Sequence, residues 1–69
     1  MRSKVIITDL EIMGGTPVFR GTRVPMQTLI DYLEAGYSIE NFLNGFPTVS
    51  RQQVINFLEE AKETFLAGT

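Results

Sequence analysis

The chain of 69 residues contains no cysteine, no histidine and no tryptophan. Without cysteine there are no disulfides, and without cysteine and histidine together the usual zinc sites are excluded. The same absences remove the common nucleophile–base pairs of covalent catalysis. We therefore expect a protein that is not an enzyme and that holds no metal or cofactor. The absence of cysteine also suits a cytosolic chain.

Long apolar runs are missing as well. The longest near the N-terminus is Val5-Ile6-Ile7, which is too short for a signal peptide and far below the roughly 20 residues that span a bilayer. We expect no membrane segment and a cytoplasmic location. A chain this short forms one domain, residues 1–69, whose core alone supplies roughly 3–5 kcal/mol. Oligomerisation or a bound partner therefore remains as a source of further stability.

Charge and turn residues divide the chain into a head, residues 1–24, and a body, residues 25–69. Residues 1–25 have a balance of +2 and residues 26–69 a balance of −4, which gives the net charge of −2. An acidic chain is poorly suited to non-specific DNA binding, which depends on phosphate neutralisation. Specific binding by a dimer with local basic patches stays open.

The head is rich in turn signals. Segment 14–25 holds three glycines, two prolines and two arginines, but it has neither the Gly-Lys-Ser/Thr ending of a P-loop nor the spacing of a dinucleotide-binding loop. Residues 4–8 are rich in β-branched side chains and predict a short strand. Val18-Phe19 and Arg23-Val24 are expected to form the arms of a small hairpin around Gly21.

The strand at 4–8 has no sure partner within so strand-poor a chain. An unpaired strand edge is a template for pairing with another chain. We therefore expect a homodimer joined through the N-terminal strands.

The body predicts three helices. The first, about 25–35, has Pro25 as its first residue and Gly36 at its C-terminal cap. The second, about 39–44, is capped by Ser38 and ends at Gly45. The third, about 51–66, begins with a Ser50/Gln53 capping box. Its apolar residues follow a 3.6-residue period, and four phenylalanines are expected in the core: Phe42, Phe46, Phe57 and Phe65.

Two arginines of the head, Arg20 and Arg23, are not required by turn geometry. Across a tight hairpin they should lie close together, and two like charges repel unless an anion separates them. An ion pair with Asp31 or Glu34 is the internal alternative. The functional alternative is a carboxylate of a partner protein or a phosphate, which makes both arginines candidate partner-binding residues.

A short helix, a glycine-containing turn and a long helix follow the order of a helix-turn-helix motif. In that motif the first residues of the second helix contact base edges, where arginine pairs with guanine and glutamine or asparagine with adenine. The connection from Gly45 to Val49 is longer than the usual turn, and Gln53 is also explained as a cap. The candidate DNA-binding residues are Arg51, Gln52, Gln53 and Asn56.

Glu59, Glu60 and Glu63 bring carboxylates together at helical spacing. No histidine or further carboxylate supports a metal or acid/base site there. We interpret these three side chains as a solvated helix face.

The motifs of the head and of the helix ends resemble those of the domain of unknown function family numbered 433. The most specific is Gly-x-Pro-x-x-x-Gly-Thr-Arg at 15–23, and the resemblance covers nearly the whole chain. This motif lies within a longer matching segment, residues 13–25. The other matching segments are Ile7-Thr8-Asp9, Leu33-Glu34-Ala35-Gly36-Tyr37-Ser38 and Phe46-Pro47.

The resemblance implies a mainly α fold, a homeodomain-like three-helix bundle of helix-turn-helix type with a short N-terminal β element. It also implies a role as a VapB-type antitoxin, because some members are encoded beside toxins with a PIN-like nuclease domain. Such nucleases hold a metal with clustered carboxylates, which arginines such as Arg20 and Arg23 could block. Many antitoxins bind their toxin with a C-terminal extension. This chain stops at Thr69, so toxin contact is expected to use the domain itself.

The leading hypothesis is thus an antitoxin and autoregulator that binds a PIN-like nuclease and operator DNA as a homodimer. The alternative is a protein-interaction module that does not bind DNA. The acidic body favours that alternative.

Overall fold

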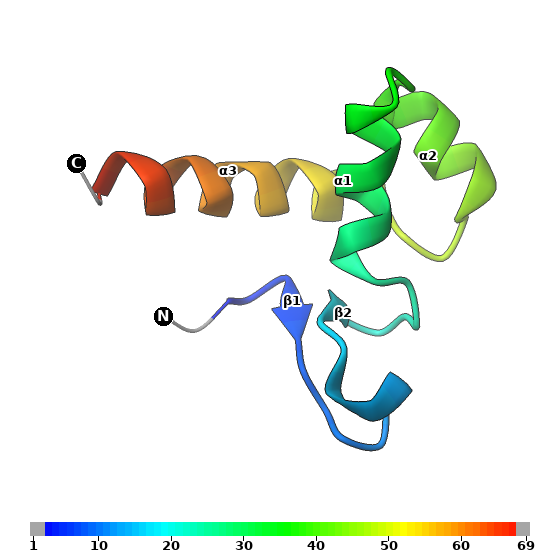
Figure 1. The fold of residues 1–69 in the computed structure, drawn as a ribbon, viewed down its shortest axis with the longest axis vertical. Coiled ribbons are helices and arrows are strands. Elements are labelled where there is room, and N and C mark those ends of the chain that lie inside the picture. Colours follow the sequence, from blue (N-terminus) through cyan, green and yellow to red (C-terminus); the bar gives the residue numbers. More distant parts are fainter. Residues whose placement is uncertain (1–2, 68–69) are drawn as a thin grey trace.

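A computed structural model describes residues 3–67 and confirms a mainly α chain with a small β element near the N-terminus (Figure 1). Strand β1 (Ile6–Ile7), a 3-10 turn (Met13–Gly15) and strand β2 (Val18–Phe19) form the head. Three helices follow: α1 (Met26–Glu34), α2 (Ile39–Gly45) and α3 (Arg51–Ala67).

The two strands pair with each other. They are antiparallel, with Ile6 opposite Phe19 and Ile7 opposite Val18. The other edge of β2 meets the predicted hairpin arm, since Phe19 N–H donates to the Val24 carbonyl at 3.0 Å and Val18 bridges Pro25. Gly21 lies in the turn between them with φ +78°, a backbone conformation that other residues adopt only at a cost.

The expectation that the N-terminal strand lacks an internal partner was therefore wrong. The Ser3 hydroxyl oxygen also accepts from the N–H groups of Val5 and Ile6 at 3.0 and 2.9 Å, so these two backbone donors of the N-terminal segment are already satisfied. A backbone edge whose donors are already satisfied is a poor template for another strand. Pairing of N-terminal strands thus loses its physical reason as the basis for a homodimer.

Both ends of helix α1 are set by residues that cap them. Pro25 is its N-cap, with ψ 142°, rather than its first helical residue. At the other end Gly36 has φ +90°, as its predicted capping role requires. Gly36 N–H donates to the Leu33 carbonyl and Tyr37 N–H to the Tyr32 carbonyl, which is the paired bonding of a Schellman cap.

Helices α2 and α3 both begin with a serine cap. Ser38 accepts from Asn41 N–H at 3.1 Å, while the Asn41 side chain accepts from Ser38 N–H. The predicted Ser50/Gln53 capping box is present at the start of α3. The five residues between α2 and α3 are longer than a standard helix-turn-helix turn, and Val49 within them is buried.

The hydrophobic core lies where the head meets the first turns of α3 and the inner faces of α1 and α2. Phe42 and Phe19 are fully buried, with ring centroids 6.1 Å apart, and Phe57 meets Phe19 edge-on at 5.9 Å. Phe46 packs against this cluster at its margin. The buried residues are Val5, Val18, Phe19, Val24, Leu29, Phe42, Val49, Val54 and Phe57.

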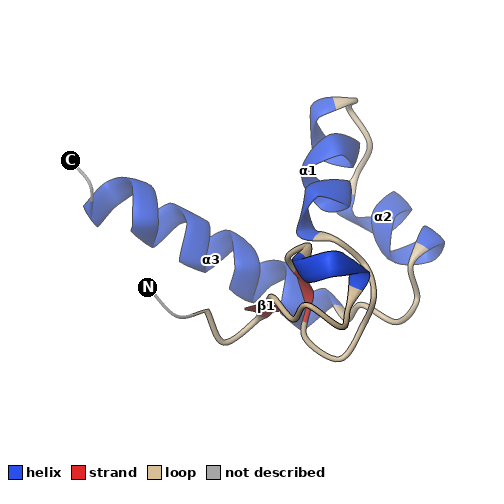
Figure 2. Cartoon of the chain, turned by 60° about the horizontal axis from the view of Figure 1, so that its bottom comes forward, coloured by secondary structure: helices blue, strands red, loops and turns tan. Residues whose placement is uncertain are grey.

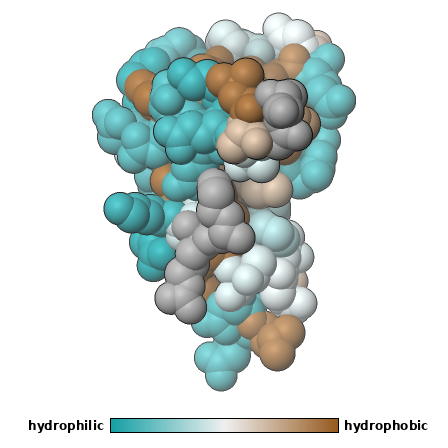
Figure 3. All heavy atoms as spheres, turned by 90° about the vertical axis from the view of Figure 1, so that its left-hand side faces the viewer, coloured by the Kyte–Doolittle hydropathy of each residue, from teal (hydrophilic) through white to brown (hydrophobic). Residues whose placement is uncertain are grey.

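Helix α3 enters this body only with its first turns. Its C-terminal half projects away from α1 and α2 in both ribbon views (Figures 1 and 2). Phe65 is 78% exposed, so its assignment to the core was wrong. Leu58 is also exposed, and Figure 3, which faces the side where α3 ends, shows hydrophobic side chains at the surface among hydrophilic ones.

Candidate partner-binding surface

Arg20 is anchored by the backbone of the N-terminal segment. Its Nε–H donates to the Lys4 carbonyl at 3.0 Å, and its own N–H donates to the Val5 carbonyl at 2.7 Å. These bonds fix the Nε of the guanidinium group, although the residue as a whole is exposed. Within residues 3–67, the ion pairs do not include Arg20.

Arg23 is also exposed and forms no ion pair with a described carboxylate. Neither Asp31 nor Glu34 serves as the internal partner that charge alone suggested, and Asp31 instead accepts from Gln27 at 2.9 Å. The two arginines border different hollows: Arg20 one between β1 and α3, and Arg23 one beside Thr22 and Thr48. They therefore do not form a single paired site.

The larger hollow, which we call the β1–α3 hollow, has a volume of about 830 Å³. Its walls come from the N-terminal segment with β1, from Pro17 and Arg20 on either side of β2, from Met26 at the start of α1, and from the middle of α3. Six of the eleven lining residues are apolar, and Arg20 and Glu60 supply the charges. The apolar ones are Ile6, Ile7, Pro17, Met26, Phe57 and Ala61, and the uncharged polar ones are Ser3, Thr8 and Thr64.

Glu60 ties the N-terminal segment to α3. The Ser3 hydroxyl donates to one carboxylate oxygen at 2.5 Å, and Lys4 N–H donates to the other at 3.2 Å. This makes Glu60 different from Glu59 and Glu63, which lie at the exposed surface. The interpretation of all three as a solvated face thus holds for two of them and was wrong for Glu60.

Replacing Glu60 with alanine is expected to lower the free energy of unfolding by about 1–2 kcal/mol, because two hydrogen bonds to a partly buried carboxylate are lost. Alanine is a good helix former, so α3 itself is retained. Urea denaturation measures the change. The matched control is Glu63→Ala, expected within about 0.5 kcal/mol of the parent protein. Equal losses in the two variants would contradict a structural role for Glu60.

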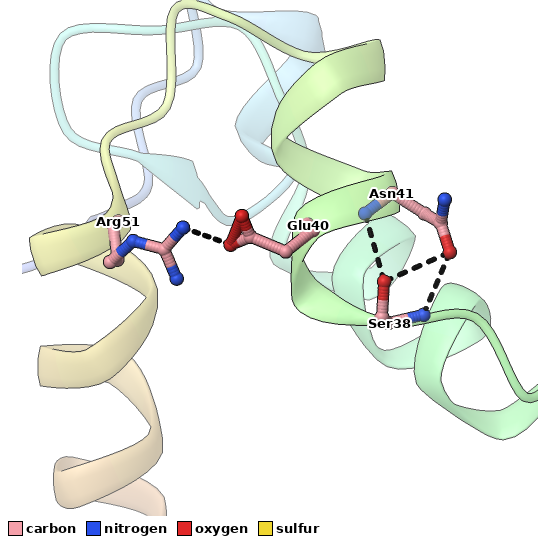
Figure 4. Close-up of polar contacts among 4 residues, drawn as sticks. All are labelled: Ser38, Glu40, Asn41 and Arg51. Atoms are coloured by element: carbon pink, nitrogen blue, oxygen red, sulfur yellow. Dashed lines mark hydrogen bonds and ion pairs between the residues drawn. The ribbon is translucent and has the colours of Figure 1, made fainter.

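The predicted DNA-binding residues lie in the first turns of α3, and Figure 4 shows Arg51 at the start of that helix. Arg51 forms an ion pair with Glu40 in the first turn of α2. Both side chains are more than half exposed, so the pair contributes at most about 1 kcal/mol to stability. An arginine held this loosely is still free to exchange Glu40 for another acceptor.

Gln52 and Asn56 are exposed and contact each other, since Gln52 Nε2 donates to Asn56 Oδ1 at 2.8 Å. Gln53 is different. Its Oε1 accepts from Ser50 N–H at 2.9 Å and its Nε2 donates to the Arg20 carbonyl at 2.9 Å. Both ends of the Gln53 amide are thus used within the fold, whereas Arg51, Gln52 and Asn56 point their polar groups to the surface.

No cluster of three or more potential metal ligands occurs among residues 3–67. Over the same described range, none of the helices has the length and apolar character needed to cross a membrane.

Sequence reasoning missed that Ser3 and Lys4 bond to Glu60 and so join the N-terminal segment to α3 at the β1–α3 hollow. These contacts join residues that are 57 and 56 positions apart in the chain. Local sequence patterns do not predict such long-range pairs. The capping box at the start of α2 also went unpredicted. The sequence contains a signal for it, because Asn41 follows Ser38 by three residues.

Comparison with known proteins gives a family but no activity. Residues 6–61 match the family described as "Protein of unknown function (DUF433)". The uncharacterized protein y4eO of Sinorhizobium fredii is 35% identical over 51 residues, which are 74% of this chain and 23% of that protein. The chain thus spans about a quarter of that relative's length. No solved structure matches the chain. The family match includes both strands, α1, α2 and most of α3, so the chain belongs to the DUF433 family.

Proposed function

We propose that this domain binds a protein partner as an antitoxin does, and that the partner is a PIN-like nuclease. The observation that carries the proposal is the anchored, exposed Arg20, whose Nε is held by the Lys4 carbonyl and which has no carboxylate partner among residues 3–67. A pre-positioned guanidinium loses less freedom on binding than a mobile one. Clustered carboxylates of a nuclease site are complementary to it in charge and geometry.

The exposed apolar residues of α3 support a protein partner. Leu58 and Phe65 lie on the same side of the helix as the buried Val54, because their spacings of four and seven residues return to one face. Apolar side chains that continue a core face into solvent are typical of a surface that is covered by another protein.

Operator binding is the second candidate, and the first turns of α3 favour it. Arg51, Gln52 and Asn56 are exposed there and carry donors and acceptors that suit base edges. Because two-fold operators are bound by two-fold proteins, this function requires a homodimer. In this second proposal Gln53 supports the helix instead of contacting DNA.

The test is co-expression with the neighbouring reading frame, followed by isolation of the complex and a growth assay. The proposal expects a stable complex, relief of growth inhibition, and weaker binding by Arg20→Gln. A complete absence of complex and of growth rescue would refute it. Gel shifts with the protein's own upstream DNA test the second candidate: equal binding by Arg51→Ala, Gln52→Ala and the parent protein would eliminate it.

A further inference from the structure

The β1–α3 hollow combines one unpaired positive charge with an apolar wall. We infer that it binds a short segment of a partner protein in which an apolar side chain stands next to an aspartate or glutamate. The apolar side chain enters between β1 and α3, and the neighbouring carboxylate pairs with Arg20. The inference rests on the proposed function in taking the occupant to be a protein.

The charge in the hollow determines the sign of the ligand. Glu60 is the carboxylate that lines the hollow among the described residues, and it already accepts from Ser3 and from Lys4 N–H. Arg20 uses its Nε for the Lys4 carbonyl, which leaves its terminal amino groups for a ligand. Lys4 is exposed beside it. A carboxylate can accept two parallel bonds from a guanidinium, and this geometry favours it over a neutral group.

The apolar wall determines the class of ligand. Ile6, Met26 and Ala61 are only half-buried where they line the hollow, and Phe57 forms its inner end. A nucleic-acid phosphate would pair with Arg20 but leave this apolar wall in water. An apolar side chain beside a carboxylate satisfies both parts of the site.

Nuclear magnetic resonance titration of the full labelled chain tests the inference. The probes are a capped five-residue peptide of alternating leucine and aspartate, its leucine–asparagine counterpart, and a short single-stranded oligonucleotide. We expect the aspartate peptide to shift the amide signals of Ile6, Arg20 and Ala61, with a Kd on the order of 1 mM. It should bind roughly three- to tenfold more tightly than the asparagine peptide, since one charge-assisted contact is partly exposed to solvent.

Two variants and one control locate the binding. Arg20→Gln should remove the preference for aspartate. The control is Lys62→Gln, which removes one positive charge from α3 outside the hollow and should keep the preference. Ala61→Leu should fill the hollow and weaken both peptides, which tests the site without altering Arg20. Equal affinity for the two peptides, shifts confined to other residues, or tighter binding of the oligonucleotide at Arg20 would overturn the inference.

The two proposals fail separately. A complex with the neighbouring gene product that is weakened by Arg20→Gln but unchanged by Ala61→Leu would refute the assigned hollow and leave the antitoxin function standing. Peptide binding at the hollow without any such complex would refute the antitoxin function and support the assignment of the ligand.

Discussion

Replacing Phe42 with alanine is expected to leave much of the protein unfolded at room temperature. The Phe42 ring is fully buried and packs against three other rings, with centroid distances of 6.1 Å to Phe19, 5.7 Å to Tyr32 and 5.1 Å to Phe46. Removing such a ring costs about 3–5 kcal/mol through lost burial and a cavity. A domain of this size has a core that supplies roughly the same amount.

Circular dichroism during thermal and urea denaturation measures this loss. The matched control is Phe65→Ala, which removes the same ring from a position that is 78% exposed. That variant should change the free energy of unfolding by less than about 0.5 kcal/mol. A large loss from Phe65→Ala would mean that the projecting part of α3 is covered in solution, for example by a second copy of the chain.

Replacing Gln53 with alanine is expected to lower the free energy of unfolding by about 1–2 kcal/mol. The substitution removes one half of the capping box with Ser50 and also the bond to the Arg20 carbonyl, which joins α3 to the head. Loss of a helix cap costs about 1 kcal/mol. Loss of the hydrogen bond to the Arg20 carbonyl adds to this cost.

Gln52→Ala is the control for Gln53, because the Gln52 side chain donates to Asn56 within its own helix. Such a pair contributes about 0.2–0.5 kcal/mol. Gln53→Glu separates the two roles of the side chain, since a carboxylate can accept from Ser50 N–H but cannot donate to Arg20. If Gln52→Ala and Gln53→Ala have equal effects on stability, the structural role assigned to Gln53 is wrong.

Local signals in the sequence were sufficient for the helices. Ser38, Ser50 and Gly36 mark helix ends by chemistry that acts over three or four residues, and the structure confirms all three. Helix α1 begins one residue later than predicted, because the proline ring of Pro25 also suits the extended backbone of an N-cap. Periodicity correctly identified which face of α3 is apolar.

Periodicity could not show where the body ends. Phe65 continues the stripe of Val54 and Leu58, but α3 has by then left the core, and only the tertiary arrangement shows this. The partner of β1 and the contacts of Glu60 are likewise long-range. Among the described residues Arg20 forms no ion pair with Asp31 or Glu34, so the internal alternative was wrong. Its side chain instead donates to the Lys4 carbonyl, a contact that no charge pattern predicts.

The contacts of Glu60 also have a kinetic consequence. They close a loop of nearly the whole domain, between positions 56 and 57 residues apart. The entropy of closing so long a loop is lost before its two hydrogen bonds can form. Because this joining rests on two hydrogen bonds outside the core, we expect it to form after the core and to open at a lower free energy than the core.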